Sequence, residues 1–75
     1  MYAYYYVLTA EAAIQVGVLS DKWEELSDHG ATEVAVMKVA MSRHHSYQAA
    51  EQFALESGED TWVLAPDGLV KWVPQ

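Results

Sequence analysis

The histidines are the side chains of this sequence with the widest range of chemistry, and two of them are adjacent. His44 and His45 follow Arg43 and directly precede Ser46, a residue typical of a helix N-cap. A metal site needs at least three protein ligands, and neighbouring residues of a strand point to opposite faces. His29 could be a third ligand, although its spacing to the pair matches no metal-site pattern. We therefore expect no metal and no cofactor, and interpret the histidines as loop residues, with partner binding as the next interpretation.

The remaining polar residues do not indicate catalysis. Eleven acidic residues offer many carboxylate pairs, but none lies in an apolar context that would raise a carboxyl pKa for acid–base work. The sequence has no cysteine nucleophile and no glycine-rich phosphate loop, and its serines mostly occupy positions expected for caps and turns. A chain of 75 residues also offers few walls for a catalytic pocket. We expect a protein that is not an enzyme.

Acidic residues dominate the charge, with eleven carboxylates against four basic side chains and a formal net charge of −7. They form two groups around the predicted helices: Asp21, Glu24, Glu25 and Asp28, and then Glu51, Glu56, Glu59 and Asp60. The few basic residues cannot neutralise nucleic-acid phosphates or hold an anionic membrane surface, so neither is expected as a partner. A solvated face is the ordinary interpretation of such groups. The functional interpretation is that the first group docks a basic protein partner, such as a nucleic-acid-binding host protein.

Tyrosines crowd the first apolar segment. Strand alternation would place Tyr2, Tyr4 and Tyr6 on one face and Tyr5 on the other, so both faces carry aromatic surface. The face of Tyr2, Tyr4 and Tyr6 is either an exposed partner-binding surface or one side of a central strand that is covered on both faces. An uncovered edge strand could also pair with its twin in a homodimer.

The elements that must position these groups predict a single α+β domain over residues 1–75. Residues 2–8 favour a strand, and residues 10–29 show helical spacing of apolar positions. Gly17 and the Ser20-Asp21 pair are weak points at which this helix could kink or split in two. Residues 33–41 are ambiguous, because a short apolar run suits a buried strand or a buried helix, and their three valines favour the strand.

The C-terminal half carries the clearest patterns. Ser46 caps a predicted helix over residues 47–57, and Pro66-Asp67-Gly68 predicts the turn of a hairpin. Pairing Ala65 with Leu69 would place Trp62 opposite Trp72 on one face. The predicted fold is a single-layer sheet of three to four strands with two helices packed on one face, and a helical 33–41 segment would reduce the sheet to three strands.

The absence of cysteine fits a reducing, cytoplasmic compartment. The first eight residues lack the basic start and the cleavage pattern of a signal peptide, and no apolar stretch approaches the ~20 residues of a spanning helix. We expect a cytoplasmic protein without a membrane segment.

The segment SYQAAEQFALESGEDTWVLAPDGLVKWV, from Ser46 onward, resembles very small phage and mobile-element accessory proteins, including some anti-CRISPR proteins. The shared features are a short Ala-rich helix and a terminal hairpin ending in D-G-x-x-x-W-V, over somewhat more than a third of the chain. The resemblance implies a protein that binds a host macromolecule and blocks it. We therefore expect a protein-binding inhibitor or modulator, with a structural or assembly subunit that self-associates through the Tyr-rich strand as the alternative. A histidine-dependent metal or small-ligand binder is a third possibility.

Overall fold

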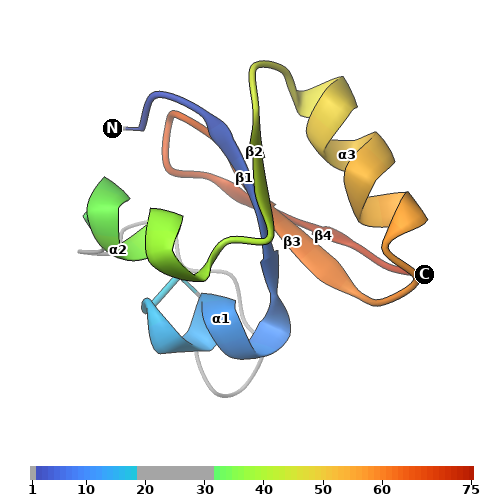
Figure 1. Cartoon of the computed structure of the whole chain (residues 1–75), viewed down its shortest axis with the longest axis horizontal. Coiled ribbons are helices and arrows are strands. Elements are labelled where there is room, and N and C mark those ends of the chain that lie inside the picture. The colour runs from blue at the N-terminus through green and yellow to red at the C-terminus, as the bar shows by residue number, and fades with distance from the viewer. Residues whose placement is uncertain (1, 19–31) are drawn as a thin grey trace.

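A computed structural model of the chain describes residues 2–18 and 32–75. Four antiparallel strands in these ranges form one sheet in the order β2-β1-β3-β4 (Figure 1). The strands are β1 (Tyr5–Thr9), β2 (Ser42–His44), β3 (Thr61–Leu64) and β4 (Val70–Val73). β1 and β3 are the interior strands, as expected from their nearly continuous apolar runs, and β2 and β4 form the two edges.

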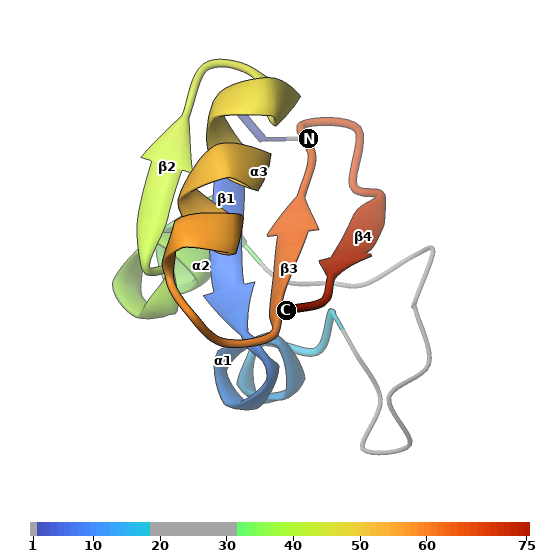
Figure 2. The same ribbon diagram turned by 90° about the vertical axis from the view of Figure 1, so that its right-hand side faces the viewer.

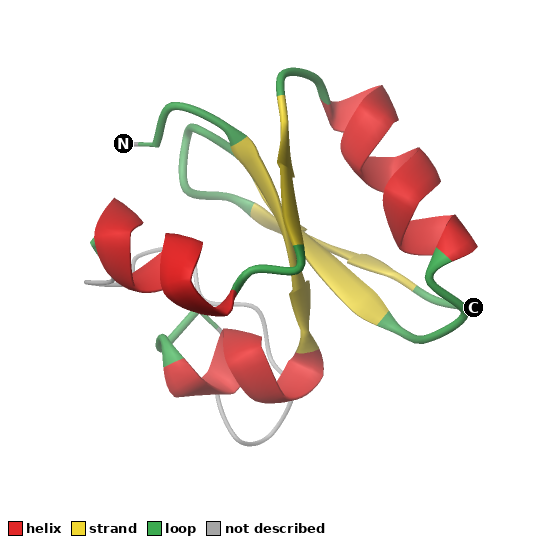
Figure 3. Cartoon of the chain, viewed as in Figure 1, coloured by secondary structure: helices red, strands yellow, loops and turns green. Residues whose placement is uncertain are grey.

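The described part of the chain also holds three helices, which cover the sheet on both faces: α1 (Ala10–Gln15), α2 (Glu33–Val39) and α3 (Tyr47–Glu56). α3 lies on one face, and α1 and α2 lie on the other (Figures 2 and 3). The α+β class is confirmed, while the helices occupy two faces instead of one. The reason lies in the interior strands, since Val7 and Val63 pack under α3 and Tyr6, Leu8 and Leu64 pack on the opposite side.

The first helix begins where the sequence predicts and ends early. Thr9 is its N-cap, and its hydroxyl oxygen accepts a hydrogen bond from Ala12 N at 3.2 Å. α1 ends at Gln15, and Gly17 follows with φ of 81°, a left-handed conformation that glycine adopts without a steric penalty. The predicted interruption at Gly17 is therefore confirmed. The rest of the predicted helix, including Ser20-Asp21, lies outside the described residues.

The interpretation of residues 33–41 as a strand is wrong, because most of this segment is helix α2. Thr32 caps the helix by accepting a hydrogen bond from Ala35 N at 3.2 Å, and Val36 faces the core while Val34 and Met37 stay exposed. This cap and one-sided burial favour a short helix over a strand that alternates. The sheet still has four strands, since β2 starts just after this segment.

α3 and the C-terminal hairpin are confirmed. Ser46 caps α3 by accepting from Ala49 N at 3.2 Å. Trp62 pairs with Trp72 across the hairpin, and their rings stack with centroids 6.2 Å apart and an interplanar angle of 21°. Gly68, with φ of 91°, takes the left-handed position of the turn. Local turn chemistry thus sets the register of the hairpin.

Candidate functional site

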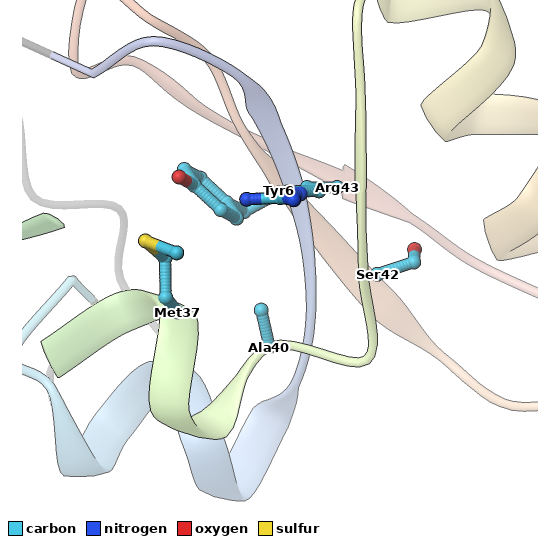
Figure 4. Close-up of a pocket in the computed structure, with 5 residues that line it drawn as sticks. All are labelled: Tyr6, Met37, Ala40, Ser42 and Arg43. Atoms are coloured by element: carbon cyan, nitrogen blue, oxygen red, sulfur yellow. The ribbon is translucent and has the colours of Figure 1, made fainter. Parts of the chain in front are cut away.

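The described residues form a pocket of about 290 Å³ between α2 and the β1–β2 edge of the sheet. It is lined by Tyr6, Met37, Ala40, Ser42 and Arg43 (Figure 4). The side chains of Met37 and Ala40 point toward Tyr6, whereas the Ser42 hydroxyl points away from them. The pocket therefore has apolar walls and one cationic side chain.

A hydrogen-bonded carboxylate fixes the tyrosine wall of this pocket. Glu33 Oε2 accepts from the Tyr6 hydroxyl at 2.5 Å and from Ala3 N at 2.8 Å. The bond from Tyr6 lowers the pKa of Glu33, with help from Ala3 N–H and, at longer range, Arg43. Burial, together with the same hydrogen bond and the Glu33 charge, raises the pKa of Tyr6 to about 12. Tyr6 therefore stays protonated at neutral pH and does not act as a base or nucleophile there.

Arg43 sits on β2 directly opposite Tyr6, so both side chains lie on the same face of the sheet. Its guanidinium lies over the Tyr4 ring, with the central carbon 4.8 Å from the ring centroid, and His45 packs on the same ring at 5.2 Å. Within the described ranges Arg43 makes no ion pair at contact distance. The contact with Tyr4 is a cation–π interaction, which uses none of the five N–H donors of the guanidinium as a hydrogen bond.

A serine and a histidine lie within hydrogen-bond distance on the opposite face of β2. Ser42 Oγ is 2.7 Å from His44 Nε2, and the His44 ring packs on Phe53 of α3 at 5.4 Å. A nucleophilic serine needs a base oriented by a third group and donors for an oxyanion. No third group of this kind is bonded to His44 in the described part of the chain. We therefore interpret the Ser42–His44 pair as a structural polar contact under α3.

The interpretation of the histidines as loop residues is wrong for His44, which belongs to β2 and whose half-buried ring packs on Phe53 of α3. His45 follows the strand, is exposed and contacts Tyr4, so the two rings lie on different sides, as argued from strand alternation. His29 lies outside the described residues. Across residues 2–18 and 32–75, no group of three or more His, Asp or Glu side chains could hold a metal ion.

The face that carries Tyr2, Tyr4 and Tyr6 belongs to the hydrophobic core. Tyr2 and Tyr6 are only 9% and 1% exposed, and Tyr4 is half-buried with its ring edge-on to Tyr6 at 6.2 Å. β1 is also an interior strand, hydrogen-bonded to β2 and β3. This arrangement favours the interpretation of a central strand covered on both faces over an exposed binding surface or a twin-pairing edge.

The two groups of acidic residues differ in whether the structure describes them. Asp21, Glu24, Glu25 and Asp28 all lie outside the described residues. In the second group, Glu51 accepts from the Tyr47 hydroxyl at 3.1 Å, and Asp60 accepts from Gln75 N at 2.9 Å. Glu59 and Asp60 are exposed and directly precede β3. Asp67, in the hairpin turn, is also exposed. The described carboxylates therefore include a set at both ends of the hairpin.

The edge strand β4 combines open backbone groups with exposed apolar side chains. Ala65 N donates to Leu69 O at 2.8 Å, which makes this a bonded pair of the hairpin. Bonded and non-bonded pairs alternate in an antiparallel ladder, so Val70 and Trp72 direct their N–H and C=O groups away from β3. Trp72 is 52% exposed and Leu69 is 59% exposed.

A second pocket of about 340 Å³ adjoins this edge on the α3 side. Leu69 and Lys71 of the hairpin and Tyr47 of α3 contribute to its lining. The Lys71 ammonium lies over the Tyr47 ring, 5.0 Å from its centroid, and is therefore turned toward α3.

Sequence reasoning missed both pockets. The Tyr6–Glu33 bond and the Tyr6–Arg43 pairing join residues that are far apart in the chain, and no local pattern carries that information. The pairing of Trp62 with Trp72 was predicted from the hairpin turn, whereas the edge position of β4, which exposes Leu69 and Trp72, follows from a strand order that the sequence did not predict.

Comparisons of the chain with protein-family models, with curated proteins and with solved structures found no match. Helices in the described ranges are all too short to cross a bilayer.

Proposed function

We propose that this chain is a non-enzymatic protein that binds another protein and modulates it, by pairing an extended, basic segment of that partner with β4. The observation that carries this proposal is the edge of β4, where Val70 and Trp72 present backbone groups that no strand of residues 2–18 and 32–75 pairs with, beside an exposed tryptophan ring. Strand addition to a sheet edge obtains its affinity from main-chain hydrogen bonds and its specificity from pockets for alternate side chains.

The two faces beside β4 provide different contacts for such alternate side chains. On one face, the half-exposed Trp72 ring stacks on the buried Trp62, which supports it. On the other face, the 340 Å³ pocket opens between the hairpin and Tyr47. Aromatic anchors that lose little side-chain freedom on binding are favourable contact residues at interfaces.

Charge complementarity argues for a basic partner segment. The whole chain carries a net charge of −7, and Asp60 and Asp67 lie near the two ends of β4. Lys71, the cation of this strand, is directed at the Tyr47 ring under the α3 face. A basic segment along the edge would therefore meet carboxylates at both ends, and association would be faster at low salt.

In a more specific form of the proposal, the partner is a host nucleic-acid-binding protein in the cytoplasm, and this chain inhibits it by covering a basic surface. The charge and the resemblance to phage and mobile-element accessory proteins support this form. The acidic group of Asp21, Glu24, Glu25 and Asp28 would extend the contact. Its distinguishing test is competition, since nucleic acid should displace the inhibitor from its target.

The experiment is selection of binders from a library of unstructured random peptides, followed by amide hydrogen exchange of the complex. We expect selected peptides to be rich in Lys and Arg with alternating apolar residues, and the amides of Val70 and Trp72 to become protected. Trp72→Pro should abolish binding because proline has no N–H, and an edge strand tolerates it. Trp72→Val separates the loss of the ring from the loss of the N–H group.

Val34→Thr is the matched control, because Val34 is an exposed apolar residue on the distant helix α2. Peptide binding that survives Trp72→Pro, with protection appearing elsewhere, would overturn the proposal. Selection of acidic peptides would overturn the basic-partner part. If the chain binds only itself, and sedimentation gives a dimer that Trp72→Pro disrupts, the assembly role replaces the inhibitor role.

A further inference from the structure

The pocket between α2 and the β1–β2 edge is separate from the β4 edge and carries an inference of its own. Its volume of about 290 Å³ lies near the lower limit of small-molecule sites, which is roughly 300 Å³. Its walls are the ring of Tyr6, the thioether side chain of Met37 and the methyl group of Ala40 (Figure 4). Space of this size and lining suits a small apolar body.

The charged group at this pocket is set up to receive an anion. Arg43 lines the pocket, and its guanidinium carbon lies 4.8 Å from the centroid of the Tyr4 ring. The guanidinium carries parallel N–H donors that match a carboxylate. Within the described residues, no carboxylate is paired with Arg43 at contact distance.

The Glu33 carboxylate, which interacts electrostatically with Arg43, is held by other donors. Its Oε2 accepts from both the Tyr6 hydroxyl and Ala3 N. These two donors offset its charge locally and lock the Tyr6 ring as a wall. The same negative charge repels an anion at the hydroxyl end of Tyr6, so a bound anion is directed to Arg43.

We propose that this pocket binds a small monocarboxylate with an apolar or aromatic body. The carboxylate accepts hydrogen bonds from the Arg43 guanidinium, and the body packs between Tyr6, Met37 and Ala40. The carboxylate supplies the ion-pair partner that Arg43 does not have among the described residues, and the apolar walls exclude a large or highly charged molecule.

The test uses phenylacetate and its neutral isostere phenylacetamide, titrated into the whole chain and followed by NMR. We expect saturable shifts of the Met37 methyl and the Arg43 side-chain N–H, with a dissociation constant on the order of 1 mM for so small a ligand. The amide should bind about tenfold more weakly or worse, because charge-assisted bonds are the stronger ones.

Arg43→Gln should weaken phenylacetate binding by about tenfold or more, and Arg43 is exposed, so the fold should survive. Lys71→Gln is the matched control, because it removes the same charge from a cation that stacks on a different tyrosine. Equal weakening by the two variants, equal binding of acid and amide, or no saturable shift would each overturn the proposal. Binding of peptide C-termini without phenylacetate would also overturn it, in favour of a peptide site.

Discussion

Glu33 joins three parts of the chain through one carboxylate oxygen. It belongs to α2, and its Oε2 holds Ala3 of the N-terminal segment and Tyr6 of β1. Because both donors favour the ionised carboxylate, this residue couples the position of α2 to its charge. The same contact makes Tyr6 a fixed wall of the small pocket.

This contact predicts a loss of stability at both extremes of pH. The folded pKa of Glu33 is lowered, so its contribution is present above the unfolded value of 4.5 and is lost as pH falls through the folded pKa. The pKa of Tyr6 is raised from 10.0 to about 12, so its contribution is present below pH 10.0 and is lost as pH rises toward 12. Denaturant unfolding across pH checks both.

Tyr6→Phe should remove the alkaline loss and most of the acid loss assigned to Glu33, while lowering stability at neutral pH. Tyr5→Phe, on the opposite face of β1, is the matched control and should keep both. An unchanged pH profile in Tyr6→Phe would contradict this assignment.

Thr61 gives a second prediction at the level of a single atom. Its side chain is fully buried, and its hydroxyl oxygen has no hydrogen-bond partner in the described part of the chain. A buried unsatisfied polar group costs about 1–3 kcal/mol, so Thr61→Val should raise the free energy of unfolding by about 1 kcal/mol. Urea denaturation measures the change.

Thr9 is the matched control, because it pairs with Thr61 across the sheet and its hydroxyl caps α1. Thr9→Val should lower the free energy of unfolding by about 1 kcal/mol, since it removes a working cap. The same chemical change therefore has opposite signs at the two positions. A similar loss in both variants would show that the Thr61 hydroxyl is satisfied.

At the scale of elements, the features that were predictable from sequence are those set by neighbours in the chain. The Pro66-Asp67-Gly68 turn fixes the Trp62–Trp72 register, and Ser46 fixes the start of α3. Residues 33–41 were misjudged because three valines suit a strand, whereas the Thr32 cap and one buried position, Val36, favour a helix. The strand propensity of the valines was therefore outweighed by packing of a single helix face against the core.

The residues of the candidate site could not be predicted for a related reason, because contacts between distant parts of the chain bring them together. Arg43 stood out in the sequence only as a neighbour of the histidines, and its pairing with Tyr6 depends on β2 joining β1. The tyrosine face could not be assigned either, because burial of Tyr2 and Tyr6 requires α2 to lie over that side of the sheet. Long-range packing decides both, and no local spacing encodes it.

At the scale of the whole molecule, net charge should limit stability. With a net charge of −7 on 75 residues, the excess negative charges repel one another more strongly in the compact folded state than in the unfolded chain. Raising the salt concentration from about 0.01 M to about 1 M shortens the Debye length from ~30 Å to ~3 Å and should raise the thermal midpoint. A series of melts at pH 7 in sodium chloride measures this.

The control is the same series with sodium sulfate at matched ionic strength, which separates screening from the stronger burial that excluded salts promote. A midpoint that is unchanged or falls with sodium chloride would contradict self-repulsion. In that case, favourable ion pairs would have to outweigh it.

The position of β1 at the centre of the sheet has a consequence for synthesis of the chain. β1 is synthesised before β3, yet Tyr6 pairs with Leu64 and Tyr2 N donates to Pro66 O, more than fifty residues later in the chain. During translation β1 therefore remains without its neighbour β3 until the hairpin has left the ribosome. Unpaired strands of this kind are aggregation-prone, and contacts between distant residues form slowly. Folding of the sheet therefore requires the hairpin, because the interior position of β1 is completed only when β3 pairs with it.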